Sequence, residues 1–211
     1  LPKTVSIKPS DFHGMTPKMV VKEGETIKAG GTIFFDKYNE AVKCASPVSG
    51  KIEAIVRGEK RRIMEVIISV DSEIQYEQNG AMDLSSMSNE AVKEAILSSG
   101  LWLCIKQRPL DIVANPNNAP KAIFVSAFDS SPLAPDFDYV LHGKNQEFQK
   151  GLDALAKLTT GKVHLTLNGS VPADSVFTEA KGVEINKISG KHPAGNVGTQ
   201  IHHIDPVNKG E

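Results

Sequence analysis

The stretch VKEGETIKAGGTIFFDKYNEAVKCASPVSGKIEAI, residues 21–55, decides the fold of the first third of the chain. Its apolar residues come in short alternating runs such as 32–35, and Gly, Pro and charged residues separate these runs. This pattern is typical of strands and turns rather than of a helix. Similar apolar runs at 18–21, 51–56 and 64–70 extend this strand-and-turn pattern. We therefore predict a small all-β sandwich over residues 1–75.

The same stretch resembles the part of a biotinyl or lipoyl domain that carries a prosthetic group on a hairpin lysine. The candidate lysine is Lys37 in FFDKYN, and the turn ASPVSG at 45–50 corresponds to the turn that follows it in carriers. Lys37 lies ten residues before Pro47, a longer spacing than in carriers, and its neighbours are not the methionines of biotin acceptors. A solvated hairpin lysine is therefore favoured, and a carrier module modified at Lys37 is an alternative.

Composition excludes several classes of protein. The net charge of −1, with acids and bases interspersed, is not that of a nucleic-acid binder. The longest apolar runs fall far short of the roughly 20 residues that a membrane-spanning helix needs. The chain opens at Leu1 without a cationic or apolar leader, so we expect a fragment of a longer protein rather than a secreted precursor. Cys44 and Cys104 are isolated, which suggests neither a metal-binding pair nor a disulfide framework.

A polar segment at 71–87 indicates a domain boundary. We place the boundary within it, after residue 75, so that residues 76–211 form a second domain that is incomplete at its C-terminal end. Helices are predicted at 88–100, capped by Ser88 and stopped by Gly100, and at 145–161, capped by Asn145. Strands are predicted at 121–127, 139–142, 162–167 and 182–188. Alternating strands and helices favour a parallel or mixed α/β sheet.

Three polar loops follow strands of this sheet, at 126–132, 168–172 and 189–195. Ligands of open α/β sheets bind at the carboxyl ends of the strands, so these loops are candidates for a site. The alternative is that they are polar only because they are solvated.

The whole chain carries a second, more specific resemblance. The segments HGMTPKMVVKEGETIKAGGTIFFDK, ASPVSGKIEAIVRGEKR, SGLWLCIKQRPLDIVA, AIFVSAFDSSPLAPD and KHPAGNVGTQIHHIDPVNKGE closely resemble the A subunits of Na+-translocating NADH:quinone reductases. The resemblance implies the front portion of a peripheral subunit on the cytoplasmic face of the bacterial inner membrane, attached to the membrane only through partner subunits. The complex oxidises NADH, reduces ubiquinone or menaquinone and exports Na+; the isolated fragment is expected to be inactive.

That family is similar to the C subunit of the Rnf complex and to the flavoprotein subunit of complex I, whose Rossmann-like α/β domain binds FMN and NADH through a glycine-rich loop. The corresponding segment here, 101–109, has no glycine, and Trp102 and Ile105 would fill the space of a flavin phosphate. The Cys-rich iron–sulfur signature is missing, and the acidic loop keeps one acid, Asp129. We expect no cofactor in this chain, with NADH, flavins, iron–sulfur centres and quinone handled by the whole complex. A stand-alone NADH-oxidising flavoprotein is the alternative.

A role near quinone reduction would require an aromatic or aliphatic cleft with hydrogen-bond donors. The candidates, expected near the loop edge, are Trp102, Arg108, Phe128, Lys191 and His192. The alternative is structural: Trp102 in the core, Arg108 capping a helix or paired with an acid, and 191–195 as a tight turn.

The turn RGEKRR, 57–62, offers four basic residues, Arg57, Lys60, Arg61 and Arg62, for docking on an acidic subunit surface or on anionic lipid. It could equally be an ordinary solvated turn. His192, His202 and His203 suggest a metal cluster at first sight. His202 and His203 are adjacent in an expected strand, so they should point to opposite faces, and we predict no metal site.

Overall fold

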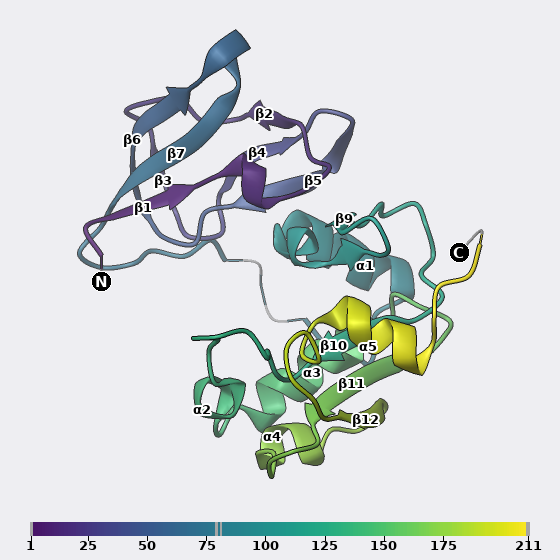
Figure 1. Ribbon diagram of the computed structural model, residues 1–211. Coiled ribbons are helices and arrows are strands. Elements are labelled where there is room, and N and C mark those ends of the chain that lie inside the picture. The colour runs from purple at the N-terminus through teal and green to yellow at the C-terminus, as the bar shows by residue number, and fades with distance from the viewer. Residues whose placement is uncertain (1, 79, 81, 210–211) are drawn as a thin grey trace. The chain divides into compact units, whose positions relative to one another are not determined.

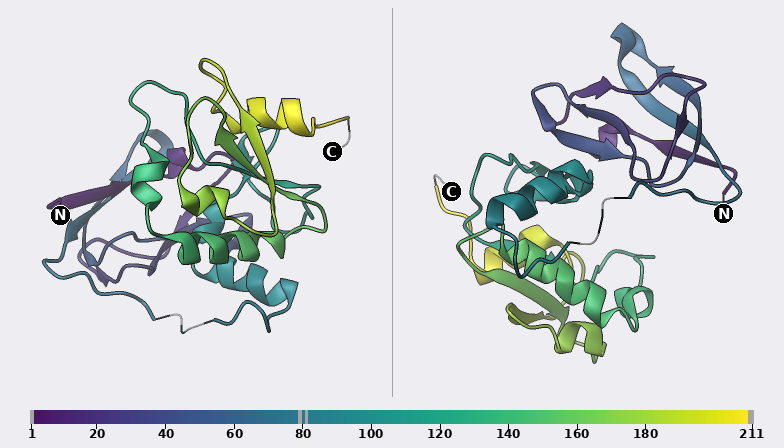
Figure 2. Two further views of the ribbon diagram at one scale, coloured as in Figure 1. Left: turned by 90° about the horizontal axis from the view of Figure 1, so that it is seen from below. Right: turned by 180° about the vertical axis from the view of Figure 1, so that it is seen from behind.

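The computed structural model describes residues 2–78, 80 and 82–209. The chain forms two compact units (Figures 1 and 2). The first comprises Leu1–Met82 and Lys93–Pro116, and the second comprises Asp83–Val92 and Asn117–Glu211. The division between the units falls more than once in the sequence, and the single boundary at residues 75–76 stays a prediction.

The first unit is built from antiparallel strands, as the alternating runs predict. One sheet has the order β1-β7-β6-β3 and a second has the order β2-β4-β5. Prediction missed β1, β3 and β5, which are short or rich in polar residues. The strands are β1 (Thr4–Ile7), β2 (Pro17–Met19), β3 (Thr26–Ile27), β4 (Thr32–Asp36), β5 (Asn39–Ala45), β6 (Gly50–Arg57) and β7 (Ile63–Val70), with short 3-10 turns at η1 (Pro9–Asp11) and η2 (Glu59–Arg61).

Strands β6 and β7 bury alternate side chains over much of their length, which is the period of two that a half-buried sheet requires. Ile52, Val66 and Ile68 are fully buried in the core of the first unit. The first residue of β6 is Gly50, and only glycine fits there, because a Cβ atom at this position would lie 2.0 Å from the carbonyl oxygen of Ser69. A side chain there would force the two strands apart.

A helix and a compact segment follow the polar linker. Helix α1 (Asn89–Ser98) begins after Ser88, whose hydroxyl accepts a hydrogen bond from the Ala91 amide at 3.2 Å, so the predicted cap is confirmed. Gly100 ends the helix with a φ of +77°, as predicted, and a Cβ atom there would lie 2.7 Å from that of Ala45. The segment continues through η3 (Leu101–Cys104), β8 (Lys106–Gln107) and β9 (Ile112–Val113).

The second unit contains a three-stranded sheet in the order β10-β11-β12. Both strand pairs are parallel, which agrees with the parallel or mixed α/β sheet predicted from the sequence. The elements are β10 (Ile123–Ser126), α2 (Phe137–Leu141), α3 (Asn145–Ala156), β11 (Val163–Asn168), α4 (Ser175–Thr178), β12 (Glu184–Ile188) and α5 (Val197–Ile204). In the described part of the chain, no helix has both the length and the apolar character to cross a membrane.

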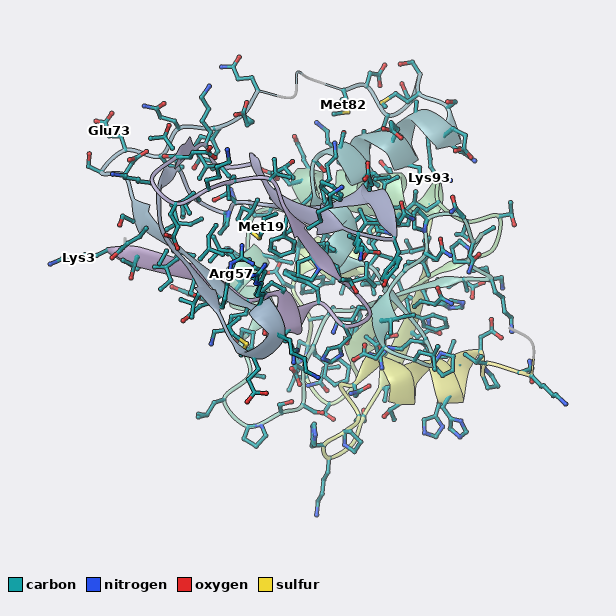
Figure 3. All side chains as sticks on the ribbon, turned by 90° about the horizontal axis from the view of Figure 1, so that it is seen from above. Lys3, Met19, Arg57, Glu73, Met82 and Lys93 are labelled. Carbon is teal, nitrogen blue, oxygen red and sulfur yellow. The ribbon has the colours of Figure 1, made fainter. Side chains whose placement is uncertain are left out.

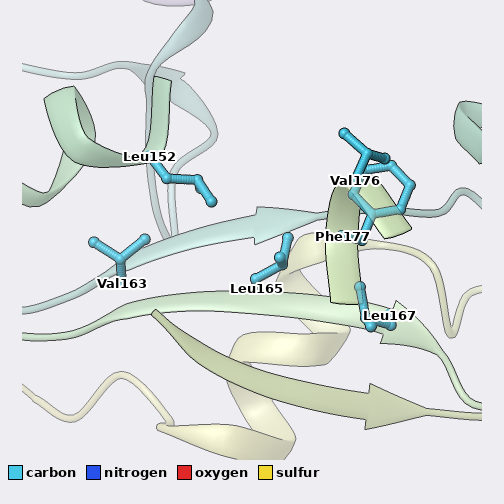
Figure 4. Packing of buried hydrophobic residues seen from close by; sticks show 6 residues of the cluster. All are labelled: Leu152, Val163, Leu165, Leu167, Val176 and Phe177. Atoms are coloured by element: carbon cyan, nitrogen blue, oxygen red, sulfur yellow. The ribbon is translucent and has the colours of Figure 1, made fainter. Parts of the chain in front are cut away.

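The core of the second unit lies between β11 and the helices α3 and α4, and Figure 4 shows α5 on the opposite side of the sheet. Its buried side chains are Leu152, Val163, Leu165, Leu167, Val176 and Phe177. The alternate residues of β11 point to the α5 side, where the ring of His164 stacks on Phe124 with centroids 4.5 Å apart. The central strand is therefore covered on both faces, as parallel strands usually are.

Three local predictions are wrong. Residues 139–142 do not form a strand, because Asp136 accepts a hydrogen bond from the Tyr139 amide and starts α2. Asn145 is the first residue of α3 and not its cap, which is Lys144. His202 and His203 lie in helix α5 and not in a strand, since the Asn196 side chain caps that helix through the Gly198 amide.

Candidate functional site

The three polar loops follow β10, β11 and β12, and because these strands are parallel the loops meet at one edge of the sheet. Hydrogen bonds join the first loop to the third. The Gly195 amide donates to Ser130 Oγ at 2.8 Å, and the same oxygen lies 3.2 Å from Nδ1 of His192. At the base of these loops, Ser126 Oγ donates to the Phe128 carbonyl at 2.7 Å and accepts from Gln200 Nε2 at 2.8 Å.

Gly195 permits the first and third loops to approach this closely. A Cβ atom at this position would lie 2.3 Å from the Ser130 nitrogen and 2.8 Å from the carbonyl carbon of Asp129. Such distances are too short for any side chain, so the contact between the loops depends on glycine at this place.

Asp129 supplies the negative charge of the first loop. Its Oδ1 atom accepts a hydrogen bond from the Ser131 amide at 2.8 Å. The pKa of Asp129 is lowered below its usual value, first by the hydrogen bonds from Ser131 and to a smaller extent by the nearby His192. The carboxylate is therefore ionised at neutral pH, near the exposed side chain of His192 in the third loop.

A pocket of about 270 Å³ opens between the first and second loops and helix α2. Its volume is close to the lower end of the range for small-molecule sites, about 300–1,000 Å³. Three aromatic rings and three carboxylates contribute to its wall. The lining residues are Ala127, Phe128, Asp129, Ala134, Pro135, Asp136, Phe137, Asp138, Leu167, Asn168, Val171, Ala173 and Phe177.

Sequence reasoning missed most of these lining residues because it predicted a strand in place of α2. A signal for the helix was present in the sequence. Asp136 is a typical N-cap residue, and it precedes the largely apolar segment FDYVL. Asp138 is also held in place, since its Oδ1 atom accepts a hydrogen bond from the Asp174 amide at 2.8 Å.

The predicted quinone-proximal residues divide between the two units. Phe128 lines the pocket, and Lys191 and His192 are exposed in the third loop of the second unit. Trp102 and Arg108 belong to the first unit. Trp102 is buried and its indole donates to the Ala114 carbonyl at 2.7 Å, while Arg108 lies 3.4 Å from the Asp111 carboxylate. These two positions match the structural alternative considered for them.

Lys37 lies at the turn between β4 and β5. Asp36 pairs with Asn39, so the turn contains only Lys37 and Tyr38, and both side chains are exposed. The Lys37 ammonium lies 5.7 Å from the centroid of the Tyr38 ring. A tight hairpin tip is the place that a carrier lysine would occupy.

The histidines suggested by the sequence are not gathered at one point. His192 lies in the third loop, and the rings of His202 and His203 on α5 stand edge to face with centroids 5.2 Å apart. Among the residues that the structure describes, no group of three or more His, Cys, Asp or Glu side chains could hold a metal ion.

The fold and the loop edge define a protein that combines a small antiparallel β sandwich with a parallel α/β unit whose strands end in a pocket. Comparison with known families gives the particular family. Residues 1–71 match the NqrA N-terminal barrel-sandwich hybrid domain, and residues 87–211 match the NqrA second alpha/beta domain. The chain belongs to the NqrA family. The barrel-sandwich match agrees with the predicted biotinyl/lipoyl-like fold of the first unit.

Individual relatives agree with the family, and each of them is named as the A subunit of a Na(+)-translocating NADH-quinone reductase. The chain is 40% identical over 207 residues to the protein of Yersinia pseudotuberculosis serotype O:1b, covering 97% of this chain and 46% of the relative. It is 40% identical over 205 residues to that of Neisseria meningitidis serogroup A, covering 96% and 45%. For Alcanivorax borkumensis the identity is 39% over 208 residues, covering 97% and 46%. The chain thus spans about half the length of these curated relatives.

Proposed function

We propose that this chain is the front portion of a peripheral subunit of a bacterial Na+-translocating NADH:quinone oxidoreductase, on the cytoplasmic face of the inner membrane. The observation that carries the proposal is the 40% identity along 97% of the chain to a protein named as the A subunit of that enzyme. Its partners are the other subunits of the complex, through which it is held at the membrane. It contributes to assembly and to the reduction of ubiquinone or menaquinone.

The chain has no flavin or iron–sulfur centre of its own, and other subunits carry the cofactors. The α/β unit is a Rossmann-like domain related to the flavoprotein subunit of complex I. The segment that corresponds to the cofactor loop of that subunit, residues 101–109, lies within the first unit here. Two observations support the absence of a flavin. Residues 101–109 contain no glycine, and Trp102 occupies the interior with its indole bonded to Ala114. Backbone amides cannot approach a phosphate closely where a bulky buried side chain fills the space.

The quinone head group would contact the loop edge of the second unit. Phe128 offers an aromatic wall, and the exposed Lys191 and His192 offer donors for the two carbonyl oxygens of the ring. Asp129 and Ser130 hold this loop pair in place through the Ser131 amide, the Gly195 amide and His192. Trp102 and Arg108 are not part of this proposal because both are engaged in structural contacts within the first unit.

Calorimetric titration of the chain with a short-chain ubiquinone tests the quinone assignment. We expect weaker binding in Phe128→Ala, Lys191→Gln and His192→Ala. Lys150→Gln, an exposed lysine on α3, is the matched control and should bind as the unchanged chain does. No binding by the unchanged chain, or an equal loss in the control, would contradict the assignment. Membership of the complex is tested separately by co-purification with the remaining subunits.

A second candidate function rests on Lys37 at its two-residue hairpin tip, where a biotinyl or lipoyl group would be attached. Intact-mass measurement of protein purified from the native host tests it. Mass equal to the bare sequence contradicts the carrier function, and added mass that disappears in Lys37→Arg supports it. Absorbance of the same sample tests the third possibility, a flavoprotein, because bound flavin would colour it yellow.

A further inference from the structure

We propose that the closed end of the β6–β7 hairpin, residues 56–64, binds the surface of an anionic lipid bilayer. This hairpin tip carries Arg57, Lys60, Arg61 and Arg62 against one acid, Glu59. All four basic side chains are exposed. Figure 1 and the right-hand view of Figure 2 show the tip reaching beyond the other strands of the first unit, and Figure 3 marks Arg57 at the end of β6.

Backbone hydrogen bonds close the hairpin tip that carries these cations. The Gly58 amide donates to the Arg62 carbonyl at 2.8 Å, and the Arg62 amide donates to the Glu59 carbonyl at 3.1 Å. The Arg57 guanidinium reaches the Arg61 carbonyl at 3.5 Å. The tip is therefore a closed turn and not a loose loop.

Two cations of the tip occupy strained backbone positions. Lys60 and Arg61 have φ angles of +52° and +61°, in the left-handed region where glycine or asparagine is the usual choice. A turn selected only for its shape would avoid that strain with glycine. Lysine and arginine at these positions carry a backbone cost that glycine would avoid, which agrees with a role for their charged side chains.

Exposed apolar side chains flank the cations. Val56 is 37% exposed and Met64 is 47% exposed. Met64 folds over Gly58, where a Cβ atom would lie 3.0 Å from its sulfur. Apolar groups next to long cationic side chains suit the boundary between lipid headgroups and acyl chains, because the alkyl stems enter the apolar layer while the charges stay at the phosphates.

The shape of the hairpin tip favours a bilayer over an acidic protein as the partner. A stable protein interface needs about 800 Å² on each side. A convex turn offers much less continuous surface, whereas it can enter a headgroup layer without a matching hollow. The inference concerns the first unit and goes beyond the proposed role of the loop edge in the second. It adds a direct lipid contact to the attachment through partner subunits proposed above.

Co-sedimentation of the chain with vesicles tests the proposal. One set contains phosphatidylcholine alone, and the other contains phosphatidylcholine mixed with phosphatidylglycerol. We expect binding only to the mixed vesicles, and weaker binding as salt is raised. Each cation removed should lower the partition coefficient about five-fold, so Lys60→Gln with Arg61→Gln should lower it about 25-fold. The matched control replaces Lys22 and Lys51, two exposed lysines of the same unit, by Gln.

Met64→Ser separates lipid insertion from simple charge attraction. It leaves the net charge unchanged, and we expect it to weaken binding to the mixed vesicles. The proposal is overturned if the unchanged chain ignores anionic vesicles, if Lys22→Gln with Lys51→Gln weakens binding as much as the tip variant, or if Met64→Ser has no effect. Circular dichroism of each variant shows whether the sandwich remains folded. Binding of the tip to an acidic protein surface in place of vesicles would count against the bilayer.

Discussion

The Nδ1 atom of His192 lies 3.2 Å from the Oγ atom of Ser130, 62 positions earlier in the chain. The same Ser130 oxygen accepts a hydrogen bond from the Gly195 amide at 2.8 Å. One hydroxyl of the first loop therefore contacts two residues of the third loop.

Gly195→Ala should break this loop pairing. The new Cβ atom would lie 2.3 Å from the Ser130 nitrogen, and the backbone has to move to relieve the overlap. We expect a loss of about 1–3 kcal/mol in the free energy of unfolding. Urea denaturation measures it, and hydrogen exchange should show faster exchange in both loops.

Gly151→Ala is the matched control for that variant. Gly151 lies within helix α3, and a Cβ atom there has no neighbour within 4 Å. Alanine loses less conformational entropy than glycine in a helix, so this variant should gain about 0.5–1 kcal/mol in the free energy of unfolding. Similar destabilisation by both alanines would contradict the claim that a clash with the first loop requires glycine at position 195.

The sequence predicts the scaffold better than the site, for physical reasons that particular residues illustrate. Strands such as β6 and β11 follow from apolar periodicity, which each strand carries within itself. The contact between Ser130 and His192 depends on the order of the strands in the sheet, and no local pattern records that order. The pocket was missed because the apolar run FDYVL fits a strand or a helix equally well, and its cap, Asp136, decides between them.

Leu165→Ala tests the core on which the loop edge stands. Leu165 is fully buried at the centre of β11, between α3 and the sheet. The substitution leaves a cavity in a region that cannot collapse easily, so we expect a loss of about 2–5 kcal/mol in the free energy of unfolding. Val171→Ala, at a residue that is 52% exposed, should change that free energy by less than about 0.5 kcal/mol. An equal effect of the two would contradict the assigned core.

The two cysteines should differ sharply in reactivity. Cys44 is buried in the sandwich, and burial, with a smaller effect of nearby Cys104, raises the pKa of its thiol to about 12. Cys104 is exposed. Because the thiolate is the reactive form, an aromatic disulfide reagent at neutral pH should titrate one thiol in the native chain and two after denaturation. Native Cys104→Ser should give none; rapid reaction of that variant would show that Cys44 is accessible.

Asp174 should make the stability of the second unit depend on pH. Its pKa is lowered from 3.8, first by the hydrogen bond from the Val176 amide and then by that from His142, whose Nδ1 atom is 2.7 Å away. The folded-state pKa therefore lies below the unfolded value, and in acid the unfolded chain binds more protons.

The stabilisation by Asp174 is thus fully present above pH about 4 and is lost as the pH falls through the folded-state pKa. Asp174→Asn keeps a side chain that can cap α4 but removes the charge. We expect the urea midpoint of the unchanged chain to fall more steeply below pH about 4 than that of Asp174→Asn. Glu179→Gln, an exposed acid just after α4, should keep the steep dependence. Parallel curves for the unchanged chain and Asp174→Asn would mean that other carboxylates govern its acid denaturation.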